Sequence, residues 1–185
     1  MDAVLSRFAR AIAASMTALA ALASGPAQAQ AVSEPAVKAA YLYKFGGYLE
    51  WPPTAALPAD APFTIGVQGA DEVAAELERL VPGRLVQGRR VEVRRVREGE
   101  SLKGVQVLFV GRGDANARET VRAATRLGIV TVTDADRGLE LGSAIAFVPL
   151  EDRIGFEVSL PAAEKAGVAI SSRMLGVARR VVPKV

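Results

Sequence analysis

Apolar residues recur along this chain in two rhythms, one with the spacing of a helix and one with the alternation of a strand. The first helical segment begins at Ser33-Glu34-Pro35, where the serine can cap the helix and the proline suits its first turn. Its apolar face consists of Val37, Tyr41, Phe45, Tyr48 and Leu49. We expect this helix to end at Trp51-Pro52-Pro53. Gly46-Gly47 then lies inside it, at a cost of about 1 kcal/mol per glycine relative to alanine unless another element packs closely there.

The middle of the chain alternates predicted strands with predicted helices. Strands are expected over residues 63–67, 91–96, 105–110 and 129–132, and helices over residues 71–80 and 114–127. Charged residues alternate with valine in 91–96, which is typical of a half-exposed strand whose charges protect the edge of a sheet. The segment 105–110 is nearly all apolar, which indicates a central strand buried on both faces.

The spacing of apolar residues changes in the last third of the chain. Residues 144–148 are apolar and residues 154–160 alternate after a short charged link, so the two segments predict a β-hairpin. A short helix should follow from Pro161, and then a final helix capped by Ser171 or Ser172. Strands and helices that alternate and then give way to a hairpin predict an α/β fold, a single compact domain with a mixed sheet and flanking helices.

The amino-terminal segment has the pattern of an export signal. Arg7 and Arg10 precede an uncharged apolar run, and Ala27-Gln28-Ala29 matches an A-x-A cleavage site. The run is shorter than the roughly 20 residues that a membrane-spanning helix needs. The alternative, an amphipathic helix of the fold, is disfavoured because the run has no polar face. We therefore expect a cleaved signal peptide at 1–29 and a periplasmic domain at 30–185, with no further membrane span.

Composition excludes several classes of function. The chain has no cysteine and no histidine, which removes disulfides, Ser-His-Asp and Cys-His catalysis, and the usual zinc sites. No serine is followed by lysine three residues later, so a Ser-x-x-Lys acyl-transfer pair is absent as well. A net charge of +3 is too small to indicate nucleic-acid binding. We expect a protein that is not an enzyme and that holds neither a cofactor nor a metal.

Two short motifs admit both a functional and a structural interpretation. Gly111-Arg112-Gly113-Asp114 stands between a predicted strand and a predicted helix, where a phosphate-binding turn would lie. Because Asp114 would repel phosphate, a tight turn with an aspartate cap is favoured. Asp134 and Asp136 follow a predicted strand and are suitable ligands for magnesium. Next to Gly138 they also suit an ordinary turn and helix cap, which is the favoured interpretation.

Arginine is concentrated in two places. One stretch of the chain holds Arg84, Arg89, Arg90, Arg94, Arg95 and Arg97, and the predicted helix 114–127 repeats arginine every four residues at Arg118, Arg122 and Arg126. A solvated basic surface is the default interpretation. The functional alternatives are a surface for an acidic partner and a surface for the anionic face of a membrane.

Two further segments resemble a known family. The first runs from Val37-Lys38-Ala39-Ala40-Tyr41-Leu42-Tyr43-Lys44-Phe45 to Leu49-Glu50-Trp51-Pro52, with aromatic residues, lysines and the Trp-Pro pair at fixed offsets. The second comprises Phe156-Glu157-Val158, residues 163–167 and Ile170-Ser171-Ser172-Arg173-Met174-Leu175. On these segments the chain resembles the YfiR family of periplasmic regulators, and the resemblance covers essentially all of residues 30–185.

The resemblance implies a function based on protein–protein binding. YfiR-like proteins are negative regulators that bind the periplasmic sensing domain of an inner-membrane diguanylate cyclase, which keeps cyclic di-GMP low and restrains biofilm formation. Family members tend to dimerise, so a homodimer is a further expectation. Some respond to periplasmic redox state through disulfides, which this cysteine-free chain cannot form. The alternative function is a periplasmic small-ligand binding protein that holds an anion through arginine.

The same resemblance places the partner contacts in the carboxy-terminal hairpin and helices and at the end of the first helix. The candidate partner-binding residues are Glu50, Trp51, Phe156, Glu164, Val168 and Arg173. For the apolar residues among them, core packing is the more frequent role. Arg173 is the leading candidate, because an arginine beside a helix cap can bind a carboxylate or a phosphate in a bidentate manner.

Overall fold

The computed structural model describes residues 32–52, 58, 60–151 and 153–184. The predicted signal peptide at 1–29 lies outside these residues, so its cleavage stays a prediction. The described elements belong to one compact unit. Within these ranges, no helix combines the length and the apolar character that a membrane crossing requires.

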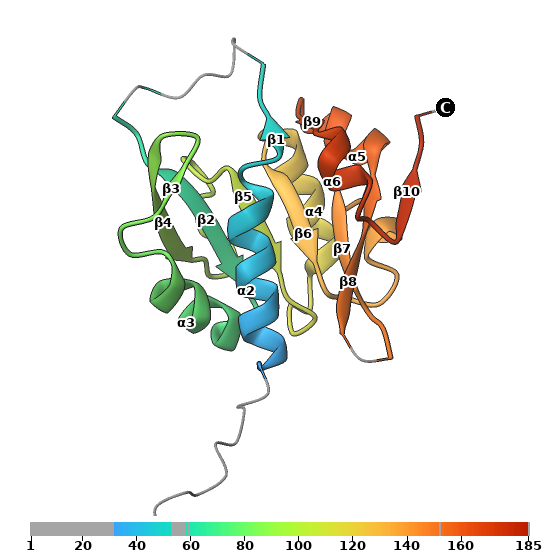
Figure 1. Cartoon of the computed structure of the whole chain (residues 1–185), viewed down its shortest axis with the longest axis horizontal. Coiled ribbons are helices and arrows are strands. Elements are labelled where there is room, and N and C mark those ends of the chain that lie inside the picture. Colours follow the sequence, from blue (N-terminus) through green and yellow to red (C-terminus); the bar gives the residue numbers. More distant parts are fainter. Residues whose placement is uncertain (1–31, 53–57, 59, 152, 185) are drawn as a thin grey trace, which may run out of the picture. The chain divides into compact units, whose positions relative to one another are not determined.

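A mixed sheet of eight strands forms the centre of the domain (Figure 1). Its strands are β2 (Phe63–Gln68), β3 (Leu85–Val86), β4 (Arg89–Arg95), β5 (Val107–Val110), β6 (Val130–Thr133), β7 (Ile145–Pro149), β8 (Ile154–Ser159) and β10 (Arg180–Val182). They lie in the order β10-β8-β7-β6-β5-β2-β4-β3. The β7–β8 and β3–β4 pairs are antiparallel and the other neighbours are parallel. The predicted α/β fold with a mixed sheet is therefore confirmed.

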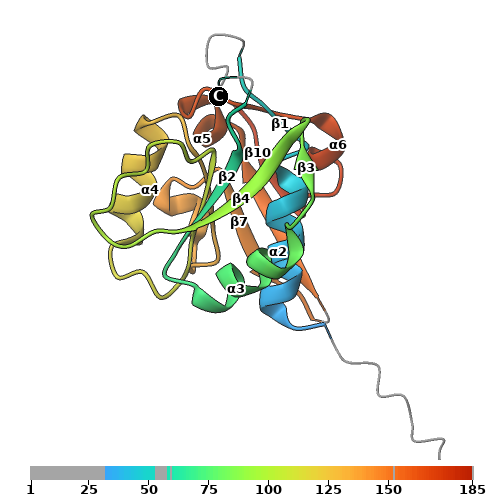
Figure 2. The same cartoon turned by 90° about the vertical axis from the view of Figure 1, so that its left-hand side faces the viewer.

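Helices cover both faces of the sheet. They are α2 (Glu34–Phe45), α3 (Asp71–Leu80), α4 (Ala117–Arg126), α5 (Leu160–Lys165) and α6 (Ser172–Leu175), with a 3-10 turn η3 (Gly138–Leu141). α2 and α3 lie on one face and α4 on the other (Figure 2). The central strand β5 is buried on both faces, as predicted: Val107 and Phe109 belong to the core on the α2 side, and Leu108 and Val110 to the core on the α4 side.

Helix α2 begins where the sequence predicts. The Ser33 hydroxyl caps it by accepting a hydrogen bond from the Ala36 N–H at 3.3 Å. Its inner face ends in an aromatic cluster, where the Phe45 ring lies 5.0 Å from Phe156 in a T-shaped arrangement and 5.9 Å from Phe147. Such pairs add about 0.5–1.5 kcal/mol each to the burial of their rings. This cluster packs the first helix onto the β7–β8 hairpin.

The predicted end of this helix is wrong. α2 ends at Phe45, and Leu49–Glu50 forms a separate strand, β1, which pairs antiparallel with β9 (Ala169–Ile170). Gly46 lies at the end of the helix rather than inside it, and a Cβ on Gly46 would come within 2.9 Å of the side chains of Phe63 and Val86. The close packing that would account for glycine at this position is therefore present.

Three further elements differ from the prediction. The segment 91–96 does not form the sheet edge, because the two-residue strand β3 pairs with the outer side of β4. α4 begins at Ala117 rather than at 114, and the last helix, α6, has four residues and is followed by the unpredicted strand β10. Strands as short as β3 and β10 are missed because an alternating pattern needs about four residues to be recognised.

Candidate functional site

Lys38 is a charged residue buried within the domain, with 4% of its surface exposed. It lies one turn after Glu34 on α2, and its Nζ is 2.5 Å from Glu34 Oε1. The same Nζ is 2.5 Å from Oδ2 of Asp134, whose side chain is 8% exposed and which follows β6. A buried ion pair therefore joins the first helix to the centre of the sheet.

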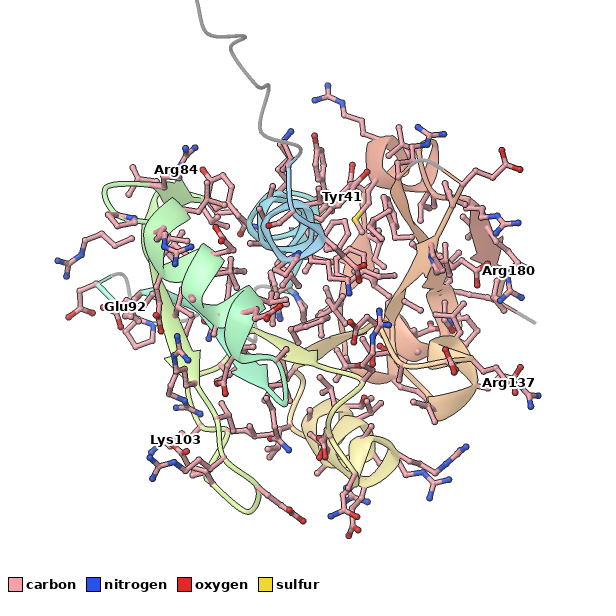
Figure 3. All side chains as sticks on the ribbon, turned by 90° about the horizontal axis from the view of Figure 1, so that it is seen from below. Tyr41, Arg84, Glu92, Lys103, Arg137 and Arg180 are labelled. Carbon is pink, nitrogen blue, oxygen red and sulfur yellow. The ribbon has the colours of Figure 1, made fainter. Side chains whose placement is uncertain are left out.

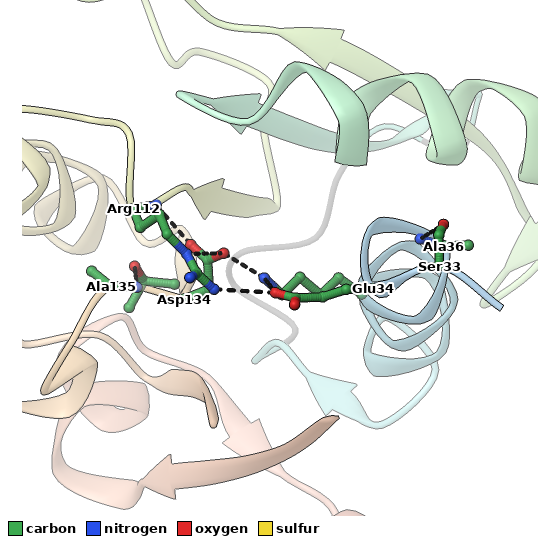
Figure 4. A network of polar contacts seen from close by, with 8 residues as sticks. Ser33, Glu34, Ala36, Arg112, Asp134 and Ala135 are labelled. Carbon is green, nitrogen blue, oxygen red and sulfur yellow. Dashed lines mark hydrogen bonds and ion pairs between the residues drawn. The ribbon is translucent and has the colours of Figure 1, made fainter. Parts of the chain in front are cut away.

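Arg112, which follows β5, completes this cluster (Figure 4). Its backbone N–H donates to Asp134 Oδ1 at 2.7 Å, and its Nε donates to Oδ2 at 3.2 Å. Its Nη2 also donates to Glu34 Oε1 at 3.1 Å. We call Glu34, Lys38, Arg112 and Asp134 the Lys38 network. It holds two acids and two bases, so its formal charges balance.

The Lys38 network determines the protonation of Asp134. Burial by itself would raise the pKa of the Asp134 carboxyl. The hydrogen bond and the charge of Lys38, together with the backbone N–H and the guanidinium of Arg112, oppose burial and hold that pKa below its ordinary value. Asp134 is therefore ionised at neutral pH and works as an anion that holds two cations in place.

A cleft of about 310 Å³ opens beside the Lys38 network. Arg137 and Arg180 also line the cleft and extend outwards on the same side of the domain (Figure 3). Arg137 contacts Glu140 at 2.5 Å, and Arg180 contacts Glu157 at 2.6 Å. Among the described residues that line the cleft, each lysine and arginine thus already contacts a carboxylate. Phe147 and other apolar residues also line the cleft. The cleft is a mixed-charge site and does not present a free cation to an anion.

The Gly111-Arg112-Gly113-Asp114 motif forms a tight turn, in agreement with its structural interpretation. A Cβ on Gly111 would lie 2.3 Å from the carbonyl oxygen of Gly69, so glycine is needed where two loops meet. The predicted aspartate cap is wrong, because α4 begins at Ala117 and its N-cap position is Asn116. Asp114 instead accepts hydrogen bonds from the Asn116 N–H at 2.8 Å and from Gln68 Nε2 at 2.9 Å.

Asp134 and Asp136 lie in the turn that the sequence predicts between β6 and η3. Asp134 is nevertheless more than a turn residue, because its carboxylate is the centre of the Lys38 network. Asp136 is exposed. Across the part of the chain that the structure describes, no three acidic side chains are grouped as metal ligands.

The apolar candidates for partner binding lie inside the domain. Phe156 is 3% exposed and Val168 is 4% exposed, and both belong to the main core. Trp51 is half-buried and packs edge-on against Phe63 at a centroid distance of 5.8 Å. These positions agree with core packing, the more frequent role of such residues. A direct contact of these residues with a partner stays a prediction.

The charged candidates are exposed. Glu50 lies on β1, opposite Ala169 of β9. This pairing places β1, which follows α2, beside the residues between α5 and α6 (Figure 1). Glu164 on α5 pairs with Lys184 at 2.9 Å. Arg173 on α6 forms no polar side-chain contact within the described ranges. Glu50 likewise forms no polar side-chain contact within the described ranges, so Glu50 and Arg173 are the predicted residues most available to another molecule.

Four of the six arginines in the stretch around β4 contact other residues of the domain through their side chains. Arg84, Arg89 and Arg94 donate hydrogen bonds to backbone carbonyl groups, and Arg95 pairs with Glu78 at 2.8 Å. Contacts of this kind tie the loops to the sheet and agree with the interpretation of a solvated basic surface.

The sequence analysis predicts no functional role for Lys38. Its spacing from Glu34 is the one available signal, and that spacing is typical of an exposed pair on a helix. Asp134 lies 96 residues away along the chain. No local pattern connects the two residues, so the Lys38 network becomes visible only once the sheet brings them together.

The fold and these sites define an α/β domain with a mixed-charge cleft and an exposed, charged carboxy-terminal region. A family model described as YfiR/HmsC-like matches residues 35–179, and the chain belongs to this family. This confirms the resemblance seen in the sequence. The match runs from α2 to the residue before β10, so it includes the whole Lys38 network apart from Glu34.

No curated protein matches the chain. Among solved structures, the chain is similar to the ABC domain in complex with L-Trp from Streptococcus pneumonia, with a TM-score of 0.50 and 15% identity. The alignment covers 80% of this chain and 60% of that one, so the chain spans less than two thirds of that structure. At this identity the similarity concerns the fold alone.

Proposed function

We propose that this protein is a periplasmic negative regulator, which binds the periplasmic sensing domain of an inner-membrane diguanylate cyclase and lowers cyclic di-GMP signalling. The family match over residues 35–179 carries the proposal. The composition supports it, because a chain without cysteine or histidine lacks the usual catalytic nucleophile–base pairs. The protein is exported, and it acts by binding rather than by catalysis.

The proposed contact surface uses the exposed charges of the carboxy-terminal region. Arg173 can bind a partner carboxylate without first breaking an internal ion pair. Glu164 has to leave Lys184, an exposed pair that contributes little to stability. A regulator must also bind one state of the sensing domain more tightly than the other, since only that difference in affinity moves the switch.

The test is a titration of residues 30–185 with the purified sensing domain of a diguanylate cyclase encoded beside this protein. Loss of one partner of a desolvated charge pair costs about 2–5 kcal/mol, so Arg173→Glu should weaken binding roughly thirty-fold or more. Arg90→Glu reverses an equally exposed charge on β4 and is the matched control. In cells, cyclic di-GMP should rise with Arg173→Glu and remain low with Arg90→Glu.

Two results would contradict the proposal at different levels. If Arg173→Glu and Glu164→Arg both bind and repress like the unchanged protein, the carboxy-terminal surface is wrong. If the unchanged protein binds no sensing domain and its deletion leaves cyclic di-GMP unaltered, the regulatory function itself is wrong.

The cleft beside the Lys38 network favours a second function, the binding of a small ligand. Its volume of about 310 Å³ lies at the lower end of the range for ligand sites. Because its cations are already paired with carboxylates, a molecule that carries both charges suits it better than a simple anion. Calorimetric titration with sulfate and with L-tryptophan, which carries both charges, distinguishes the two ligand classes. Binding of neither would leave the regulator as the supported function.

A further inference from the structure

A groove of about 600 Å³ runs between α4, η3 and α5. α4 contacts both of the other elements, so the groove has three walls. Its rim is basic: Arg118, Arg122 and Arg126 stand along α4, and Lys165 stands on α5. All four residues are exposed. We call this feature the basic groove.

The charges of the basic groove are largely uncompensated. Among the described residues that line it, the acidic one is Glu140, and Glu140 is paired with Arg137 at 2.5 Å. Arg118 donates a hydrogen bond to the backbone carbonyl of Glu140 at 3.3 Å. Within the described ranges, the side chains of Arg122, Arg126 and Lys165 make no polar contact. This distinguishes them from the arginines of the cleft and from Arg84, Arg89, Arg94 and Arg95 around β4.

The three arginines stand four residues apart along α4, and Arg126 lies in its last turn, where a cation is favourable. Like charges four residues apart repel each other and destabilise an isolated helix. The less exposed lining of the groove, which we call its floor, is mainly apolar and includes Leu139, Leu141, Pro161 and Ala162. A basic rim over an apolar floor is complementary to a ligand that carries negative charges along one side and apolar groups along the other.

The spacing of the arginines indicates the conformation of that ligand. Four helical residues advance about 6 Å along the axis, so the three arginines form a row with that repeat. Side chains on one face of an extended strand repeat every 6.6–6.8 Å or so. An extended peptide can therefore place an acidic side chain against each arginine and turn the intervening side chains towards the floor.

We propose that the basic groove binds an extended acidic segment of a partner protein, with acidic residues at alternate positions. An anionic membrane is the other partner that a row of arginines can attract. A flat bilayer would touch the rim and leave the apolar floor unfilled, so the peptide fits the observed shape better. The proposal does not depend on the cyclase, because its test uses purified protein and a synthetic peptide.

The test measures the fluorescence anisotropy of a labelled peptide of alternating glutamate and valine, titrated with residues 30–185 at about 0.15 M salt, where screening acts beyond ~8 Å. The variant Arg122→Glu with Arg126→Glu should bind at least about tenfold more weakly, since two exposed ion pairs are replaced by repulsion. The control, Arg90→Glu with Arg97→Glu, makes the same change in net charge at two exposed arginines outside the groove. It should bind within about threefold of the unchanged protein.

A second variant, Arg122→Gln with Arg126→Gln, keeps good helix formers and should lose affinity in the same direction. Equal weakening by the groove variant and the control would overturn the proposal, as would failure of the unchanged protein to bind the peptide. Vesicles with anionic headgroups form the second arm of the experiment. Binding to vesicles that requires Arg122 and Arg126, without binding to the peptide, would assign the groove to a membrane and also overturn the proposal.

Discussion

Lys38 shows how one residue of a family motif acquires a role from its surroundings. It projects from α2 into the domain and meets Asp134, while Glu34 and Arg112 supply further charges. A buried charge is costly unless it is paired and hydrogen-bonded. Asp134 meets both conditions for Lys38, so each of the two residues depends on the other.

Replacement of Asp134 tests this dependence. Asp134→Asn leaves Lys38 with the exposed Glu34 as its one carboxylate partner, and the loss of its buried partner should lower the free energy of unfolding by about 3 kcal/mol. Asp136→Asn changes an exposed aspartate in the same turn and should alter that free energy by less than about 0.5 kcal/mol. Urea unfolding of both variants measures the difference. Equal stability of the two would mean that the Lys38 network does not stabilise the fold.

The pKa of Asp134 predicts a pH dependence. Because that pKa is lowered in the folded state, the folded state binds fewer protons than the unfolded state. The stabilisation is complete above the ordinary aspartate value of about 3.9, and it is lost as the pH falls through the lowered folded-state pKa. Unfolding free energies measured between neutral pH and about pH 3 should therefore show the gap between the unchanged protein and Asp134→Asn narrowing below about pH 4. A gap that stays constant would contradict this assignment.

At the scale of elements, the end of α2 depends on packing rather than on helix propensity. The apolar pattern continues to Leu49, yet the chain leaves the helix at Gly46 and forms β1. Gly46 lies against Phe63 and Val86, where a larger residue would collide. The close approach of this turn to β2 and β3 therefore stops the helix and frees the next residues to pair with β9.

The two neighbouring glycines provide a matched pair of variants. Gly46→Ala forces a Cβ to within 2.9 Å of two side chains and should destabilise the protein by about 1–3 kcal/mol. Gly47→Ala meets nothing closer than the Lys44 carbonyl oxygen at 3.5 Å, so it should be within about 0.5 kcal/mol of the unchanged protein. Thermal and urea unfolding measure the stability of both variants and of the unchanged protein. Similar effects at both positions would show that loss of glycine, and not close packing, is responsible.

At the scale of the whole molecule, the two proposed surfaces meet at α5, which contributes Lys165 to the basic groove and Glu164 to the charges proposed for partner binding. The basic groove is lined by residues of α4, η3 and α5, and β1, α5 and α6 carry the exposed charges proposed to meet the cyclase. Each surface can therefore be changed by mutation without altering the residues of the other.

The predicted export signal leads to a test on the whole chain. If residues 1–29 are removed on export, mass spectrometry of protein extracted from the periplasm should give an amino terminus at or near Gln30. Substitution of Ala27 and Ala29 by bulky residues should block cleavage at this site. Recovery of the uncleaved chain from the cytoplasm would contradict both the export and the proposed periplasmic function.

The absence of cysteine leads to a second test at this scale. A chain without thiols cannot form or break a disulfide. The affinity of residues 30–185 for a cysteine-free sensing domain should therefore be equal with and without dithiothreitol. A change in affinity on reduction would point to a redox-sensitive component other than this protein.

The sequence by itself determined the type and order of most elements. The helix predicted at 71–80 is α3, and the apolar run at 105–110 contains the buried strand β5, because periodicity and burial follow from local backbone geometry. Composition also determined which chemistry is excluded, since a missing cysteine or histidine cannot be supplied by folding. The family motifs could also be recognised in the sequence, because they consist of particular residue types at fixed spacings.

Only the tertiary structure decided how distant segments meet. It brought Lys38 to Asp134, ended α2 at Phe45, and separated the buried Phe156 from the exposed Arg173. It also showed that Arg94 and Arg95 on β4 bind their own domain whereas Arg122 on α4 does not. These features depend on the register of strands and the packing of helices, which are set by contacts between residues far apart in the chain and leave no local pattern.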